Sequence, residues 1–104
     1  MPVDTATGVG DGRTAVPADF QLLGSFPNPF NAVARVVYRL DHPGRVELVV
    51  YTLLGQKVST LVDGIQEAGT HTAYFEPGKY SSGVFITRLA FGGHSAVGKM
   101  VLIK

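Results

Sequence analysis

The chain has 104 residues, 45% of them hydrophobic, which suffices for one packed domain and excludes two. No apolar run approaches the roughly 20 residues of a membrane-spanning helix, and the first ten residues lack the basic and apolar regions of a signal peptide. A net charge of +1 argues against a nucleic-acid binder. The absence of cysteine excludes disulfides, thiolate metal sites and a cysteine nucleophile.

The composition changes near residue 20. Residues 1–19 contain three Gly, two Pro and no aromatic residue, whereas all ten aromatic residues lie between Phe20 and Phe91. Such a segment buries too little apolar surface to offset its ordering entropy. We therefore expect residues 1–19 to be a flexible linker or tail, and residues 20–104 to be the folded domain.

Two alternating segments follow the linker. Residues 33–40 place Ala34, Val36, Tyr38 and Leu40 on one face, which predicts a strand. Residues 45–52 place Val46, Leu48 and Val50 opposite Glu47, Val49 and Tyr51. Since this second face is not polar, we expect the strand to be covered on both sides or to border another module. A turn at Asp41–Gly44 separates the two strands.

Residues 57–62 admit two interpretations. A helical pattern is present, but Gly55 and Gly64 bracket the segment, and Val58, Ser59, Thr60 and Val62 are poor helix formers. A strand is the better prediction, followed by a loop over 63–69. The helical pattern consists of Leu54, Val58, Leu61, Val62 and Ile65.

The remaining chain predicts three more strands. Residues 70–75 are rich in β-branched and aromatic side chains, residues 84–91 place Phe85, Thr87, Leu89 and Phe91 on one face, and residues 95–104 place Met100 and Leu102 on one face. Gly92-Gly93 is a hairpin signal. With a possible seventh strand at 20–23, turns recur every 8–12 residues. The fold class is therefore predicted to be all-β, an antiparallel Ig-like β-sandwich of about seven strands.

No constellation of reactive residues is apparent. His42, His71 and His94 lack metal-ligand spacing, and we expect surface positions for them. Ser81 and Ser82 precede Gly83 without the strand–turn–helix context of a nucleophile elbow. The glycines at 8, 10 and 12 lack the helix that a phosphate loop requires. We expect no catalytic residue, metal or cofactor, and therefore no enzyme.

The most unusual stretch is 25–31, Ser-Phe-Pro-Asn-Pro-Phe-Asn. Two prolines between aromatic residues make a stiff extended segment without two backbone donors, which cannot be a central strand. We expect it to lie along the edge of the sandwich, with Phe26 and Phe30 anchored in the core and with Asn28 or Asn31 turning the chain.

Several motifs, taken in order, resemble a known family. They are FPNPFN at 26–31, VELVVYTLLGQKVSTLVDG at 46–64, AGTHTAYF at 68–75, SSGVFITRL at 81–89 and KMVLIK at 99–104. This series is similar to the type A C-terminal sorting domain of the type IX secretion system of Bacteroidetes, itself related to the Ig-like domain of flagellar hook-capping proteins. Residues carrying the structural motif are Phe26, Pro27, Asn28, Pro29, Phe30, Asn31, Gly55, Gly69 and Gly83.

The resemblance implies a module at the C-terminus of a larger exported protein, read by an outer-membrane translocon and used to attach the cargo to the cell surface. Any catalytic domain would then lie outside this chain. We expect recognition at the last strand, where an apolar run flanked by lysines can pair with a partner's edge through its backbone. The candidate residues are Lys99, Met100, Val101, Leu102, Ile103 and Lys104.

Two other functions stay open. A carbohydrate-binding module would need exposed aromatics, for which Tyr51, Tyr74 and Tyr80 are the candidates, although packing in the sheets is the more ordinary role of Tyr51 and Tyr74. An Ig-like spacer would need no recognition site. In each case we expect a monomer that binds no nucleic acid, and in the sorting interpretation one without a small-molecule substrate.

Overall fold

The computed structural model describes residues 19–104, so the linker expected over 1–19 lies outside the described residues except for Asp19. These residues form seven antiparallel strands and no helix. The all-β sandwich predicted from the sequence is confirmed. The strands are β2 (Phe20–Phe26), β3 (Ala34–Leu40), β4 (Gly44–Thr52), β5 (Lys57–Gln66), β6 (Gly69–Phe75), β7 (Gly83–Phe91) and β8 (His94–Leu102).

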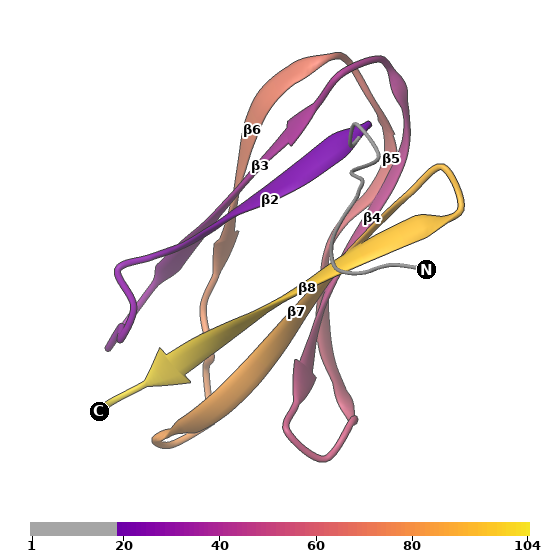
Figure 1. The fold of residues 1–104 in the computed structure, drawn as a ribbon. Helices are drawn as coiled ribbons and strands as arrows, with labels where there is room; N and C mark the ends of the chain where they lie inside the picture. Colours follow the sequence, from indigo (N-terminus) through magenta and orange to yellow (C-terminus); the bar gives the residue numbers. More distant parts are fainter. Residues whose placement is uncertain (1–18) are drawn as a thin grey trace, which may run out of the picture.

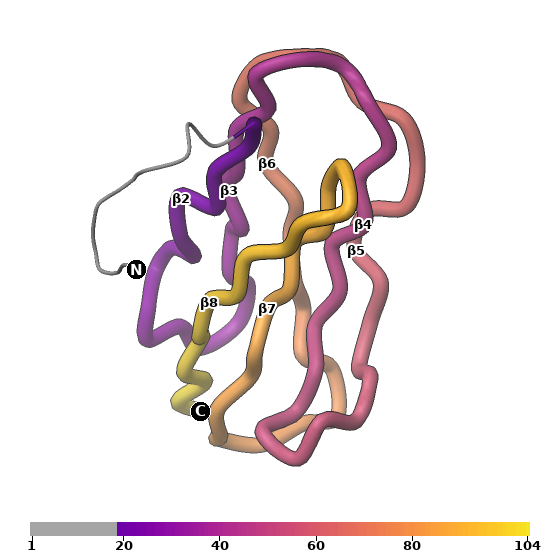
Figure 2. Tube along the Cα trace, turned by 45° about the vertical axis from the view of Figure 1, so that its right-hand side comes forward, coloured from indigo at the N-terminus to yellow at the C-terminus, as the bar shows by residue number. Residues whose placement is uncertain are grey.

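The strands divide between two sheets that face each other (Figure 1). One sheet has the order β2-β3-β6 and the other has the order β5-β4-β7-β8. In immunoglobulin constant domains, the fourth strand belongs to the same sheet as the first two strands. Here β5, the fourth strand in the chain, instead pairs with β4 at the edge of the four-stranded sheet. The chain crosses between the sheets after β3, β5 and β6, as the trace in Figure 2 shows.

The core is built from the alternating faces that the sequence predicted. On β3, the four predicted inward residues are all buried, and on β7 the face of Phe85, Thr87, Leu89 and Phe91 is buried as well. Aromatic rings cross the space between the sheets, with Phe75 making edge-to-face contacts to Phe30 and Phe85. On β4, Val49 is buried although it lies on the outer face, so that face is partly covered, as its composition indicated.

The predicted strand at 57–62 is confirmed, but the loop expected over 63–69 is wrong for most of its length. β5 continues to Gln66 because β4 extends back to Gly44 and supplies a partner for each of residues 63–66, with Gln66 opposite Gly44. Gly64 sits within the strand, and only Glu67 and Ala68 join β5 to β6. The first strand is also longer than expected, reaching Phe26 with a bulge between Leu22 and Gly24.

The glycines at two tight turns adopt backbone conformations that other residues avoid. Gly92 and Gly93 both have positive φ, 60° and 82°, as the predicted hairpin between β7 and β8 requires. At the β4–β5 turn, Gly55 has φ 92°. Gly69 is also at positive φ, whereas Gly83 simply begins β7 in the ordinary region.

Candidate recognition site on the last strand

The last strand, β8, lies at the edge of its sheet, and its one neighbour among the seven described strands of the two sheets is β7. Its inward residues Met100 and Leu102 are buried in the core, whereas Lys99 and Val101 lie on the outer face of the sheet. Ile103 and Lys104 follow the strand and are exposed. Of the six predicted recognition residues, four therefore offer side chains to a partner and two complete the core.

The stretch 26–31 lies directly against this strand. The Asn28 side chain donates from Nδ2 to the carbonyl oxygen of Lys99 (2.9 Å), and its Oδ1 accepts from the backbone N–H of Val101 (3.0 Å). The backbone N–H of Phe30 donates to the carbonyl oxygen of Val101, and the carbonyl oxygen of Phe30 accepts from the N–H of Ile103. Asn28 and Phe30 thus act as a short parallel neighbour of β8, with Phe30 opposite Leu102.

Two expectations about this region need correction. The edge of β8 between Lys99 and Ile103 is not open for pairing with a partner strand, because Asn28 and Phe30 already use its backbone groups. Phe30 is anchored in the core as expected, at 2% exposure, but Phe26 is 43% exposed. Phe26 lies on the outer face of its sheet, because the bulge in β2 shifts the alternation before it.

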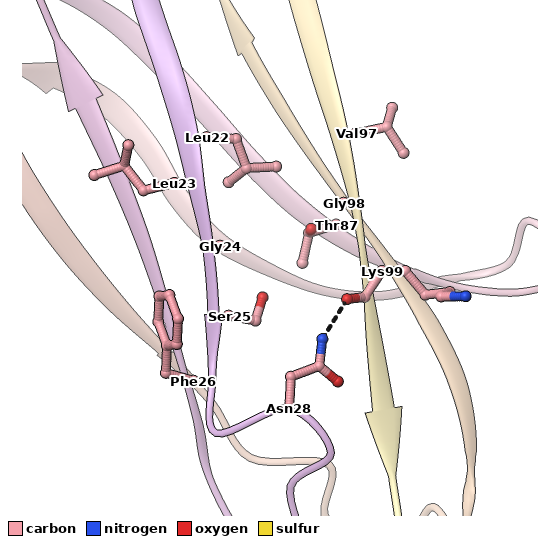
Figure 3. A pocket seen from close by; sticks show the side chains of 10 residues that line it. All are labelled: Leu22, Leu23, Gly24, Ser25, Phe26, Asn28, Thr87, Val97, Gly98 and Lys99. Carbon is pink, nitrogen blue, oxygen red and sulfur yellow. Dashed lines mark hydrogen bonds between the residues drawn. The ribbon is translucent and has the colours of Figure 1, made fainter.

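Above the Asn28 contacts, the seam between β2 and β8 opens into a hollow of about 370 Å³ (Figure 3). Leu22, Ser25 and Phe26 line one side, and Val97 and Lys99 line the other. Thr87 lies at its inner wall, fully buried, and its hydroxyl has no hydrogen-bond partner among the described residues. A Cβ added at Gly98 would lie 3.0 Å from this hydroxyl oxygen, so the missing side chain of Gly98 lets β8 pass this close to Thr87.

Charged residues divide between the two ends of the sandwich. The register places Arg35, Lys57, Lys99 and Lys104 in the half that contains the β4–β5 turn and the end of β8, and Lys79 lies in the connection that enters β7 there. Among residues 19–104, Glu76 is the one acid in that half. The other acids lie toward the opposite end, where Asp41 pairs with Arg39 and Asp63 pairs with Arg45.

Two leucines at the β4–β5 turn are the residues that sequence reasoning missed most clearly. Leu53 and Leu54 are 66% and 90% exposed. The available signal was their position, since the centre of a β-turn normally carries polar residues, Gly or Pro.

The histidines are scattered, as expected. His42 lies against the ring of Phe91 and His71 stacks on Tyr38, while His94 is exposed at the start of β8. Within the described part of the chain, no group of three His, Cys, Asp or Glu residues could hold a metal ion. Over the same residues, no helix is long and apolar enough to cross a membrane.

The three tyrosines proposed as a sugar platform do not share a surface. Tyr51 lies on the outer face of the four-stranded sheet, Tyr74 lies on the outer face of the three-stranded sheet, and Tyr80 packs edge-to-face on Phe85.

A row of aromatic and cationic side chains does form on the outer face of the three-stranded sheet. Phe26, Arg35 and Tyr74 are consecutive cross-strand neighbours, and the Arg35 guanidinium lies 5.8 Å from the centre of the Phe26 ring.

The Tyr38 side chain is buried, and its hydroxyl donates a hydrogen bond to the side-chain oxygen of Gln66. Burial raises the pKa of its phenol, and the hydrogen bond that its hydroxyl makes to Gln66 offsets part of that rise. This hydroxyl lies between the ends of β3 and β5, at the end of the sandwich away from the last strand's terminus. Its role is therefore structural, joining the central strand of one sheet to an edge strand of the other.

No protein-family model matches this chain, and a search of curated proteins finds no match to it. The geometry offers a face with lysines and aliphatic side chains at the end of β8, suited to binding an anionic or apolar partner.

Proposed function

We propose that this chain is a non-catalytic sorting and attachment module, which directs export of a larger protein through the type IX secretion system and its attachment to the cell surface. The partner is the outer-membrane translocon and its attachment machinery. The exported cargo then sits on the cell surface or outside the cell.

One observation carries the proposal beyond the resemblance of the motifs. The two most distinctive motifs, FPNPFN at 26–31 and KMVLIK at 99–104, are far apart in the chain and yet form one element, joined by Asn28 and Phe30. A shared structural element explains why both motifs occur together in one chain. It also fixes the position of the last residues, which a receptor must find in a constant arrangement.

Recognition in this proposal uses side chains rather than the strand's edge. Lys99 and Val101 point outward from the sheet, and Ile103 and Lys104 extend beyond it. The Lys104 ammonium group donates to the carbonyl oxygen of Gly78, and its backbone N–H donates to Ser82, so the end of the chain is held against the connection before β7. A receptor with acidic groups around an apolar centre matches this surface.

The test is export of a reporter. Residues 20–104 are fused to a secreted reporter in a host that has this secretion system, and the reporter on the cell surface is measured. We expect export with the intact domain, and its loss when Lys99 and Lys104 are both changed to Ala. The matched control changes Arg39 and Arg45 to Ala, which removes the same charge from the opposite end and should leave export intact.

Thermal melts of each purified domain accompany the export measurement, because a misfolded domain would mimic a lost signal. Failure of the intact, folded domain to direct any export would refute the sorting proposal. Equal loss in the lysine variant and the arginine control would refute recognition at the last strand alone.

The row of Phe26, Arg35 and Tyr74 favours a second candidate, a carbohydrate-binding module. Both aromatic rings are exposed, and the cation between them can donate hydrogen bonds to sugar hydroxyls. Binding to insoluble polysaccharides, abolished by Tyr74→Ala and kept by Tyr51→Ala, would support it. Tyr51 is the control because it lies on the other sheet.

A further inference from the structure

Hydrogen bonds fix the conformation of the β4–β5 turn, and two apolar side chains project from its centre. The N–H of Gly55 donates to the carbonyl oxygen of Thr52 (2.9 Å), and the N–H of Thr52 donates to the carbonyl oxygen of Gln56 (2.8 Å). The N–H of Gln56 also donates to the Thr52 hydroxyl (3.2 Å). These bonds leave Leu53 and Leu54 at the centre of the turn, where they are 66% and 90% exposed.

The tip belongs to the basic end of the molecule. Thr52 pairs with Phe85 and Val84 pairs with Val101, so the turn, the start of β7 and the end of β8 lie at one level. Figures 1 and 2 agree, with this turn and the C-terminal segment at the same end. Lys57 follows the tip directly, and Lys79 and Lys104 lie around the connection into β7. None of these lysines forms an ion pair with another described residue.

Apolar side chains at a projecting point, surrounded by cations, match an anionic bilayer. Leucines that enter the boundary between headgroups and acyl chains lose water-exposed surface, while lysines beside them contact the phosphates. A partner protein would need a preformed cavity to receive the two leucine side chains, whereas a fluid bilayer can accommodate them without one. We propose that this end of the sandwich docks on an anionic membrane surface, with Leu53 and Leu54 inserted and with Lys57, Lys79 and Lys104 at the headgroups.

The proposal does not depend on the sorting function and is tested without it. The full 104-residue chain is sedimented with vesicles of phosphatidylcholine alone or with 30% phosphatidylglycerol (about one lipid in three) at low salt. We expect binding to the anionic vesicles and much weaker binding to the neutral ones. Each leucine is expected to contribute roughly tenfold and each lysine about fivefold to the partition coefficient.

Two pairs of variants separate the contributions. Leu53→Ser with Leu54→Ser should reduce binding by roughly a hundredfold, whereas Ile65→Ser, at a 79% exposed position near the opposite end, should leave it unchanged. Lys57→Ala with Lys79→Ala should reduce binding about 25-fold, whereas Arg39→Ala should have little effect. All six positions are exposed, so the variants should melt like the original chain.

Several results would overturn the proposal. One is a folded chain that does not bind the anionic vesicles at low salt. A second is unchanged binding by the double leucine variant, which would leave charge alone as the cause. A third is equal binding to soluble polyglutamate, abolished by the leucine changes, because the end would then recognise an acidic polypeptide and not a bilayer.

Discussion

The side-chain amide of Asn28 donates a hydrogen bond of 2.9 Å to the carbonyl oxygen of Lys99, 71 residues further along the chain. The same side chain accepts from the N–H of Val101. A single asparagine thereby takes the place of a neighbouring strand, at a point where the flanking prolines cannot donate backbone hydrogen bonds.

Asn28→Ala removes both of these bonds and uncovers part of the β8 edge. We expect the free energy of unfolding to fall by about 1–2 kcal/mol, since each hydrogen bond contributes about 0.5–1.5 kcal/mol. Urea unfolding measures the change, and amide exchange at Val101 should speed up. Asn31→Ala is the matched control, because Asn31 is exposed and its side chain has no hydrogen bond to any of residues 19–104; an equal loss there would contradict the role of Asn28.

Phe30 and Phe26 are the same residue type, but Phe30 is buried and Phe26 is partly exposed, so the same substitution can be compared at the two positions. Phe30 is buried against Phe75, so Phe30→Ala should lower the free energy of unfolding by about 3–5 kcal/mol through the cavity that it creates. Phe26 is 43% exposed on the outer face of its sheet, and Phe26→Ala should lower the free energy of unfolding by about 1 kcal/mol or less. Chemical denaturation of both variants checks this order, and a larger loss at Phe26 would show that the edge is packed differently.

Thr87→Val should stabilise the domain. The buried hydroxyl has no hydrogen-bond partner among the described residues, and valine fills the same shape without an unpaired polar group. The expected gain is about 1 kcal/mol, visible as a higher thermal midpoint. Thr72→Val, on the exposed face of β6, should change the midpoint little. A destabilised Thr87→Val domain would mean that the hydroxyl is satisfied, for instance by water in the adjoining hollow.

Tyr38 should make stability sensitive to alkaline pH. Since burial raises the pKa of the folded phenol, the unfolded chain loses this proton first, at about pH 10. The contribution of Tyr38 is complete below that pH and is lost as the pH rises toward the folded pKa. Urea unfolding between about pH 9 and 11 should therefore show a shallower loss of stability for Tyr38→Phe than for the original chain. Identical slopes would contradict the burial effect.

The sandwich was predictable because alternation with period two is a local property. Tyr38 and Leu40 on β3, and Phe85 and Leu89 on β7, carry the pattern within their own strands, and the structure buries them all. The extent of β5 was not predictable in the same way. In the sequence, Gly64 is typical of a turn, but in the structure it pairs with Val46, because β4 extends far enough to continue the ladder with β5.

The candidate site was accessible from sequence only in part. The composition of 26–31 marked an edge segment and placed Phe30 correctly, but no local rule pairs Asn28 with a backbone 71 residues away. The segregation of charge was equally hidden. Lys57, Lys79 and Lys104 lie in three separate segments, and only the register of the sheet brings them to one end.

The contact of Phe30 with the last strand also sets when the domain can finish folding. When the chain emerges from the ribosome with its N-terminus leading, Phe30 appears early. The backbone partners of Phe30, at Val101 and Ile103, appear about 70 residues later. Met100 and Leu102 are missing from the core until then. The core therefore stays incomplete until the last strand emerges, because contacts this distant in sequence cannot form before then. The last residues to emerge thus decide when the sandwich can close.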